Sequence, residues 1–256
     1  MPAVLAPPRE RLCTVYAHFL HLPAESLTKG WWHRQCGGRP RQRSVAEMEA
    51  HRRLHGAGGN CFDLALWLRA RLEQAGITAR IAGHDWETPD AHAAVLATTA
   101  DGAEYLCDPG DLWLRPVRID APDAGWLDGL LLDRSVQLTR TPDALHVRYR
   151  RAGRYAGQQI YRLAPVAEAD LARACDHSQH LLRRPFCERL LPHPFAGGLA
   201  RWEYNGAGSY WYLADGTFYP ERVQGGLVTY LAGRSGLAPD LVTVALQAYT
   251  GQAPAP

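Results

Sequence analysis

An Asp-Gly pair at residues 101–102 separates two apolar segments, 92–97 and 104–107. Asp-Gly between apolar runs is typical of a tight hairpin turn, so the two segments are expected to pair as antiparallel strands. Residues 77–82 have a similar β-like composition and predict a third strand just before the hairpin. Because a helix-like segment precedes this meander and no strand–helix alternation follows, the pattern predicts an α+β fold.

The helix-like segment starts at Cys61. Its apolar residues recur at helical spacing on one face: Cys61, Ala65, Leu68, Leu72 and Ala75. Asn60 is a favourable N-cap, and Gly76 follows the segment where a left-handed residue is needed. A cysteine in the first turn faces unpaired N–H groups and the positive end of the helix dipole, and both favour the thiolate. The alternative interpretation of Cys61 alone is a buried apolar cysteine.

The remaining sequence predicts further helices and strands. Residues 9–22 are expected to be helical, 24–43 to form a loop, and Ser44 with Glu47 to open a helix that runs to about residue 55 with a capping box. Strands are expected at 135–138, 145–150, 158–163, 201–205, 210–213 and 217–223. Helices are expected at 167–174, 227–231 and 240–249, the last with Asp240 as its N-cap.

Charge and cysteine content exclude several classes of protein. The 256 residues carry 28 basic and 26 acidic side chains, which argues against nucleic acid or an anionic membrane as a partner. No apolar run is long enough to span a membrane, and the first eleven residues lack the apolar core of a signal peptide. The six cysteines have no Cys-x-x-Cys spacing, so they are expected to be free thiols in a reducing cytoplasm.

Three chemically competent residues follow one another along the chain. Cys61 opens a helix, His92 begins a strand, and Asp108 ends the strand that pairs with it. Pairing about the turn at 101–102 brings residues 92 and 108 to the same end of the hairpin. The aspartate could then orient the imidazole, and the imidazole could take the thiol proton, as in cysteine catalysis. The nearby alternative is His84 with Asp85 or Asp90, in a segment that has a loop-like composition.

No metal site is expected. His51 and His55 lie one turn apart on a predicted helix, but arginines stand between them and no third ligand follows at a suitable position. The two imidazoles are therefore interpreted as solvated or locally hydrogen-bonded.

Segment 58–63, Gly-Gly-Asn-Cys-Phe-Asp, together with His92 and with Tyr-Leu-Cys-Asp at 105–108, resembles the arylamine N-acetyltransferases. Segment 21–27, His-Leu-Pro-Ala-Glu-Ser-Leu, is similar to that family's His-x-x-Ile-Pro-Phe-Glu-Asn-Leu. The likeness extends weakly over most of the chain, through Pro185-Phe186 and the turn at 213–217, and its specific motifs lie between about residues 21 and 110.

The resemblance implies a fold related to cysteine proteases and transglutaminases. It has a helical part carrying the cysteine (1–76), a central antiparallel β-barrel with the histidine and aspartate (77–196), and a C-terminal α/β lid (197–256). It also implies a ping-pong reaction in which acyl-CoA acylates Cys61 and an amine removes the acyl group, with His92 as base and Asp108 as its orienter. No bound cofactor is expected; acyl-CoA, for example acetyl-CoA, would be a co-substrate and a small amine the acceptor.

The chain departs from the family pattern around the expected substrate site. The family's arginine before Gly-Gly is Ala57, so Glu25 lacks its usual partner unless Arg52 or Arg53 substitutes. Aromatic residues of the family correspond to Ala24 and Asn60. The family's Asp-Val-Gly-Phe-Gly loop is Asp-Pro-Gly-Asp at 108–111, which argues against a simple apolar arylamine pocket. Four residues are therefore predicted to contact substrate: Asn60, Pro109, Gly110 and Asp111.

Two other functions fit the same residues. The core also resembles the transglutaminase-like superfamily, which includes peptidases, amidases and amide-forming enzymes with this triad. A non-catalytic binding protein of the same fold would have an unreactive Cys61 thiol. The sequence leaves the acyl group, the acceptor and the oligomeric state open.

Overall fold

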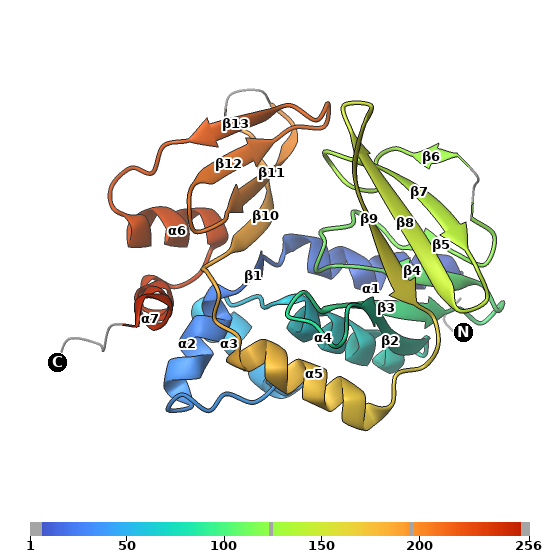
Figure 1. The fold of residues 1–256 in the computed structure, drawn as a ribbon, viewed down its shortest axis with the longest axis horizontal. Coiled ribbons are helices and arrows are strands. Elements are labelled where there is room, and N and C mark those ends of the chain that lie inside the picture. Colours follow the sequence, from blue (N-terminus) through green and yellow to red (C-terminus); the bar gives the residue numbers. More distant parts are fainter. Residues whose placement is uncertain (1–6, 123–124, 195–196, 252–256) are drawn as a thin grey trace, which may run out of the picture.

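The computed structural model describes residues 7–122, 125–194 and 197–251 (Figure 1). The first six residues, which belong to the segment searched for a signal peptide, lie outside this range. Helices are α1 (Pro8–Ala17), α2 (Leu27–Gln35), α3 (Val45–His55), α4 (Cys61–Gln74), α5 (Glu168–His180), α6 (Leu227–Ser235) and α7 (Pro239–Thr250), and a 3₁₀ turn η1 (His18–His21) follows α1. None of the helices in the described part of the chain is long and apolar enough to cross a membrane.

The larger sheet is antiparallel and curls into a half-barrel, drawn in green and yellow in Figure 1. Its eight strands lie in the order β5-β4-β3-β2-β9-β8-β7-β6. Their bounds are β2 (Thr78–His84), β3 (His92–Thr98), β4 (Glu104–Cys107), β5 (Val117–Arg118), β6 (Trp126–Leu127), β7 (Ser135–Arg140), β8 (Ala144–Arg151) and β9 (Arg154–Arg162).

The smaller sheet contains the C-terminal strands and one N-terminal strand. Its order is β1-β10-β11-β12-β13, with β1 (Ala24–Glu25), β10 (Cys187–Pro192), β11 (Leu199–Tyr204), β12 (Ser209–Tyr212) and β13 (Phe218–Glu221). Figure 1 shows α6 beside this sheet and α7 below it. The short strand β1 also pairs with Gly59, so this sheet is tied to the residues just before α4.

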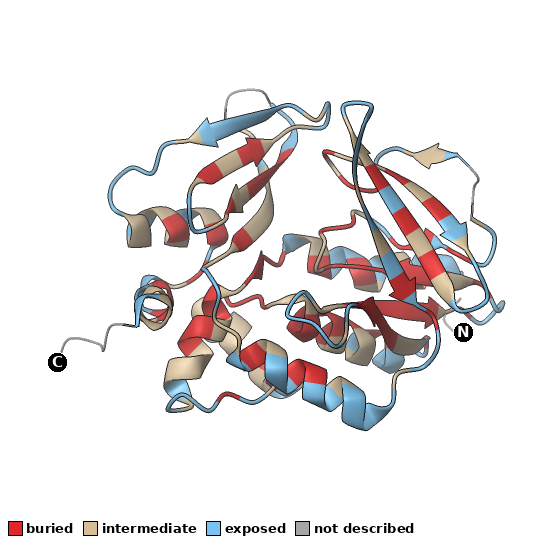
Figure 2. Cartoon of the chain, viewed as in Figure 1, coloured by how far each residue is buried: buried red, intermediate tan, exposed pale blue. Residues whose placement is uncertain are grey.

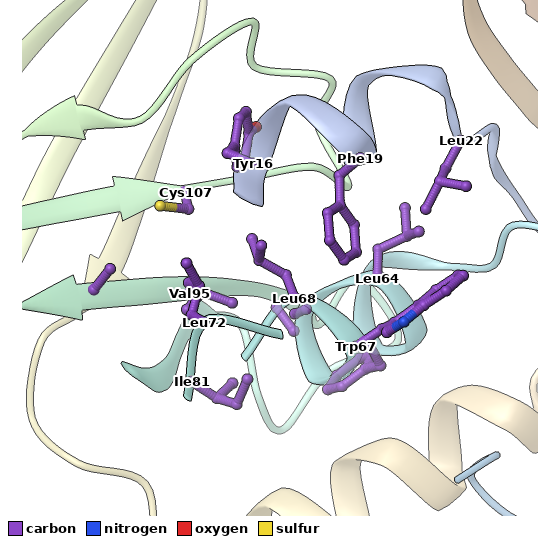
Figure 3. Close-up of a cluster of buried hydrophobic side chains, with 14 of the residues drawn as sticks. Tyr16, Phe19, Leu22, Leu64, Trp67, Leu68, Leu72, Ile81, Val95 and Cys107 are labelled. Carbon is purple, nitrogen blue, oxygen red and sulfur yellow. The ribbon is translucent and has the colours of Figure 1, made fainter. Parts of the chain in front are cut away.

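Helix α4 lies at the centre of the first hydrophobic core. Figure 3 shows Leu64, Leu68 and Leu72 of α4 pointing toward the side chains of α1, β2, β3 and β4, and Figure 2 shows how much of this region is buried. Each fully buried leucine contributes about 1.5–3 kcal/mol relative to an exposed one. Because Cys61 is the first residue of this helix, packing of the core fixes the position of the cysteine.

The predicted α+β class is confirmed, and so is the hairpin around Asp101-Gly102. In its register, Val95 pairs with Cys107 and Thr98 with Glu104. The chain turns at Gly102, whose φ of +81° favours glycine.

Two local predictions were wrong. Residues 24–43 are not a loop throughout, because α2 forms there and its Leu27 and Trp31 are buried in the core around α7 and the smaller sheet. Gly30 permits this contact, since a Cβ on it would lie 2.7 Å from the Tyr249 ring. Asp240 is not the cap of α7: Ala238 holds the N-cap position and Pro239 is the first helical residue.

Candidate active site

The N-terminus of α4 is built to present Cys61. Asn60 caps the helix: its side chain accepts a hydrogen bond from the Asp63 N–H at 3.0 Å, and the Asp63 carboxylate accepts one from the Asn60 N–H at 3.3 Å. Gly58 and Gly59 precede it, and neither has a positive φ. They are needed for space, because a Cβ on Gly59 would lie 2.5 Å from the Asp63 Cβ and one on Gly58 would lie 2.1 Å from the Pro23 carbonyl oxygen.

A buried ion pair between Arg43 and Asp63 stabilises the turn at residues 58–60. The Arg43 guanidinium donates to Asp63 at 2.8 Å and to the Gly58 carbonyl at 2.8 Å, and both charged side chains are almost completely buried. Gln179 of α5 donates to the same carboxylate at 3.1 Å. Asp63 therefore links the cap of α4 to α5 and to the segment before α3.

Glu25 does not find its partner in Arg52 or Arg53. Its carboxylate instead accepts hydrogen bonds from the Thr28 N–H at 2.7 Å and the Thr28 hydroxyl at 2.5 Å. Arg52 donates to the Gly56 carbonyl at 2.6 Å. Burial raises the pKa of Glu25, and the nearby positive charge of Arg43 acts in the opposite direction.

His92 and Asp108 meet at the end of the hairpin. The Nε2 atom of His92 lies 2.7 Å from Oδ2 of Asp108. The register of β3 and β4 extends to place residue 108 opposite Ala94, so the two residues are diagonal neighbours on adjacent strands rather than directly opposite. With Nε2 directed at Asp108, Nδ1 is the ring nitrogen left to receive the thiol proton.

Asp108 is fully buried and accepts three hydrogen bonds. Besides His92, the Tyr161 hydroxyl donates to Oδ2 at 2.7 Å and the Asp111 N–H donates to Oδ1 at 2.9 Å. Burial opposes the charged carboxylate, but His92 and these hydrogen bonds outweigh it and lower the pKa of Asp108. No sequence pattern points to Tyr161, which lies on β9, 53 residues further along the chain.

The charge state of His92 depends on its partner Asp108. Burial alone would lower its pKa, but the charge of Asp108, the nearby Cys61 sulfur and the hydrogen bond to Asp108 raise the pKa well above 6.5. The His92 side chain is 14 % exposed, so only a small part of it is accessible to solvent. The Sγ atom of Cys61 also lies 3.9 Å from the Ala91 carbonyl oxygen, just before β3. The structure thus brings Cys61, His92 and Asp108 together.

Gly110 fits between Cys61 and His92. A Cβ on residue 110 would lie 2.8 Å from the Cys61 Cβ and 3.1 Å from Cε1 of His92. Real Cβ contacts are not this short, so the loop after β4 can approach Cys61 only with a glycine at this position.

The other predicted substrate residues make structural contacts of their own. Asn60 donates from Nδ2 to the Ser178 hydroxyl at 3.2 Å, in addition to capping α4. The Asp111 carboxylate accepts from the Tyr149 hydroxyl at 3.3 Å and lies 3.9 Å from the Arg134 guanidinium. Asp111, at the position where the family's Asp-Val-Gly-Phe-Gly loop has its aromatic residue, is therefore part of a polar cluster with Tyr149 and Arg134. Contact of Asn60, Pro109, Gly110 and Asp111 with substrate stays a prediction.

The alternative histidine, His84, lies next to His92. Their rings stack at a centroid distance of 5.1 Å, and Nδ1 of His84 lies 2.7 Å from Asp85. Burial lowers the pKa of His84, and the positive charge of His92 lowers it further. Asp90 instead pairs with Arg183 at 2.7 Å. His84 is therefore an aromatic neighbour that packs against the His92 ring.

No group of His, Cys, Asp and Glu side chains within residues 7–122, 125–194 and 197–251 could hold a metal ion. His51 and His55 pack instead against Trp31, with ring centroids 4.8 Å and 5.2 Å away.

No protein-family model and no curated protein matches the sequence. Solved structures do match the fold. The arylamine N-acetyltransferase from Nocardia farcinica matches with a TM-score of 0.71 at 20 % identity, covering 96 % of this chain and 88 % of that one. The enzyme from Mycobacterium abscessus gives 0.74 at 16 % identity, covering 96 % and 90 %. The Mycobacterium marinum enzyme, in complex with CoA, gives 0.70 at 15 % identity, covering 93 % and 92 %. The chain therefore has the fold of the arylamine N-acetyltransferases.

Proposed function

We propose that this protein is a thiol-dependent acyltransferase. It would move an acyl group from acyl-CoA or another thioester, through a thioester on Cys61, to an amine. The observation that carries the proposal is the placement of Cys61 and His92 on either side of Gly110, where one added Cβ would lie 2.8 Å from the Cys61 Cβ and 3.1 Å from Cε1 of His92, with the imidazole itself held by Asp108 at 2.7 Å. The likeness in fold to N-acetyltransferases, one of them in complex with CoA, supports CoA thioesters as donors.

In the first half-reaction, His92 takes the thiol proton and the Cys61 sulfur attacks the thioester carbonyl. The carbonyl oxygen of the tetrahedral intermediate becomes negative. The Cys61 N–H, in the first turn of α4, has no partner within the helix and would be a donor for this oxygen. When the intermediate collapses, the carbon–sulfur bond to the donor breaks, and His92 returns the proton to the departing CoA thiolate.

In the second half-reaction, an amine attacks the acyl group on Cys61. His92 accepts the proton from the amine nitrogen as the new carbon–nitrogen bond forms. The Cys61 sulfur leaves as thiolate and regains the proton. Asp108 stays ionised throughout, and its hydrogen bonds keep the imidazole in the tautomer that has Nδ1 toward the sulfur.

The acceptor is expected to be a small amine. Ala24 and Asp111 stand where the family resemblance implies aromatic residues, and Asp111 is held by Tyr149. These contacts do not form an apolar slot, so a simple apolar arylamine is not the expected acceptor. The six cysteines are free, which fits a reaction in the reducing cytoplasm.

Intact-mass spectrometry after incubation with a panel of acyl-CoAs tests the proposal, with Cys61→Ala as the control. An acyl mass on the wild-type protein alone, removed by added amine, is the expected result. No adduct, together with rapid alkylation of Cys61 by iodoacetamide, would favour a transglutaminase-like amidase or peptidase instead. No adduct and slow alkylation would favour a binding protein.

A further inference from the structure

A second feature of the site is a cavity of about 220 Å³ beside Cys61, between α2, α5 and the loop that leads into β3. One wall is Ala91, whose carbonyl oxygen lies 3.9 Å from the Cys61 sulfur. Another wall is Ser178, which is hydrogen-bonded to Asn60 immediately before the cysteine. The cavity therefore lies near the Cys61 sulfur, on the side of α5, with Ala91 and Ser178 between them.

The polar lining of this cavity is basic. It includes Lys29, His177, Arg183 and Arg184, and none of the aspartates and glutamates that the structure describes lines it. Arg183 is neutralised at the exposed rim by Asp90, at 2.7 Å. The cavity thus has an excess of positive charge close to the nucleophile.

Lys29 is the only lysine of the chain. It is partly buried, and in the described part of the protein it forms no hydrogen bond and no ion pair. Burial lowers its pKa, while the more distant Cys61, Asp63 and Glu25 act in the opposite direction. A partly buried ammonium group that has no partner in the protein is less well solvated than one on an open surface, so its position favours binding of an anion.

We propose that this cavity binds a carboxylate carried by a substrate, with Lys29 as its ionic partner, and that Lys29 selects anionic over neutral substrates. The inference rests on the proposed function and specifies its substrate class. The anion is not a phosphate of CoA, because the pantetheine arm separates those phosphates from the thioester, whereas Lys29 lines the same cavity as Ala91, whose carbonyl oxygen lies 3.9 Å from the Cys61 sulfur. The carboxylate therefore belongs to the acyl group or to the acceptor amine.

Binding can be measured directly because the chain has a single lysine. Reductive methylation with ¹³C-formaldehyde gives one dimethyl-lysine signal besides the N-terminus, and Lys29→Met identifies it. Benzoate and succinate are the probes, with benzamide and succinamide as neutral counterparts. A saturable shift of the Lys29 signal by the carboxylates, and not by the amides, is expected. Equal shifts with the amides, or none with either carboxylate, would overturn the proposal.

Calorimetry on the unmodified proteins gives the affinity. Lys29→Met should weaken carboxylate binding roughly tenfold to hundredfold, as expected for loss of a charged hydrogen bond. Lys29→Arg should retain most of the affinity for the carboxylate. Arg39→Met, at an exposed position, should leave that affinity unchanged. Unchanged affinity in a folded Lys29→Met protein would contradict the assignment; if that variant does not fold, the wild-type NMR titration still decides.

Kinetics then identify which substrate carries the carboxylate. If the acceptor does, Lys29→Met should lower kcat/KM for 4-aminobenzoate and not for aniline. If the acyl group does, it should slow acylation of Cys61 by succinyl-CoA and not by butyryl-CoA. If Lys29→Met lowered the rates equally for 4-aminobenzoate and aniline, and equally for succinyl-CoA and butyryl-CoA, Lys29 would have no selective role. Carboxylate binding without acylation by any acyl-CoA would mean that the proposed function fails while the anion site stands.

Discussion

Gly110 lies so close to Cys61 that a Cβ on it would come within 2.8 Å of the Cys61 Cβ. The same added atom would be 3.1 Å from Cε1 of His92. The loop after β4 is therefore in close contact with both Cys61 and His92, and the spacing of these two residues depends on residue 110 having no side chain.

Gly110→Ala is expected to separate Cys61 from His92 by a fraction of an ångström to about 1 Å. Such a displacement of reacting groups costs up to roughly 100-fold in rate. Acylation of Cys61 by acyl-CoA, followed by rapid quench and intact mass, measures it. Gly233→Ala is the matched control, because an added Cβ meets nothing within 4 Å there. Wild-type acylation rates in Gly110→Ala would show that the contact does not set the geometry.

Asp108→Asn is expected to leave the fold intact and to remove the charge that stabilises protonated His92. Without that charge, burial dominates and the pKa of His92 falls. The turnover number should fall by roughly 10⁴-fold, as when the orienting carboxylate of a catalytic triad is replaced by an amide. NMR titration of His92 and steady-state kinetics provide the two measurements. Asp143→Asn, at an exposed turn, should change neither.

The same pair makes stability depend on pH in a defined window. The raised pKa of His92 contributes stability that is fully present below its unfolded pKa of about 6.5 and is lost as pH rises through the folded value. The lowered pKa of Asp108 contributes stability that is present above about pH 3.9 and is lost as pH falls through the folded value. Denaturant unfolding should therefore show the largest difference between wild type and Asp108→Asn between about pH 4 and 6.5. A pH-independent difference would contradict the ion pair.

The residues that were predicted from sequence have strong local signals. Asn60 and Asp63 identify the start of α4 by their capping pattern, and Asp101-Gly102 defines the hairpin that brings His92 to Asp108. Both signals depend on contacts within a few residues or across one turn. The positions of Cys61, His92 and Asp108 could therefore be anticipated.

The residues that were missed depend on distant contacts. Tyr161 reaches Asp108 only because β9 pairs with β2, and Arg43 reaches Asp63 from a segment with no regular structure. Helix α2 was missed because its two adjacent tryptophans and a glycine give no helical pattern. It is stabilised by packing against α7, more than 200 residues away in the chain.

Tyr161→Phe tests the support of the aspartate. The exchange removes one of the three hydrogen bonds to Asp108, and since that bond lowers the pKa of the carboxylate, the pKa of Asp108 should rise. A hydrogen bond to a buried charge is worth about 1.5–3 kcal/mol, so kcat should fall roughly tenfold or more. The pH–rate profile measures the change. Tyr155→Phe, on the exposed part of β9, is the control, and an unchanged profile in Tyr161→Phe would mean that Asp108 does not need this donor.

Arg43→Met tests whether the ion pair beneath the cap holds Cys61 in place. The variant leaves the Asp63 carboxylate buried without its charged partner, which should lower the free energy of unfolding by about 3–5 kcal/mol. Arg173→Met breaks the exposed ion pair with Asp170 and should change the free energy of unfolding by less than about 1 kcal/mol. Urea unfolding compares the two variants. Because Asp63 also caps α4, Arg43→Met should slow alkylation of Cys61 under conditions where the protein is still folded. A stability loss with unchanged thiol reactivity would limit Arg43 to a structural role.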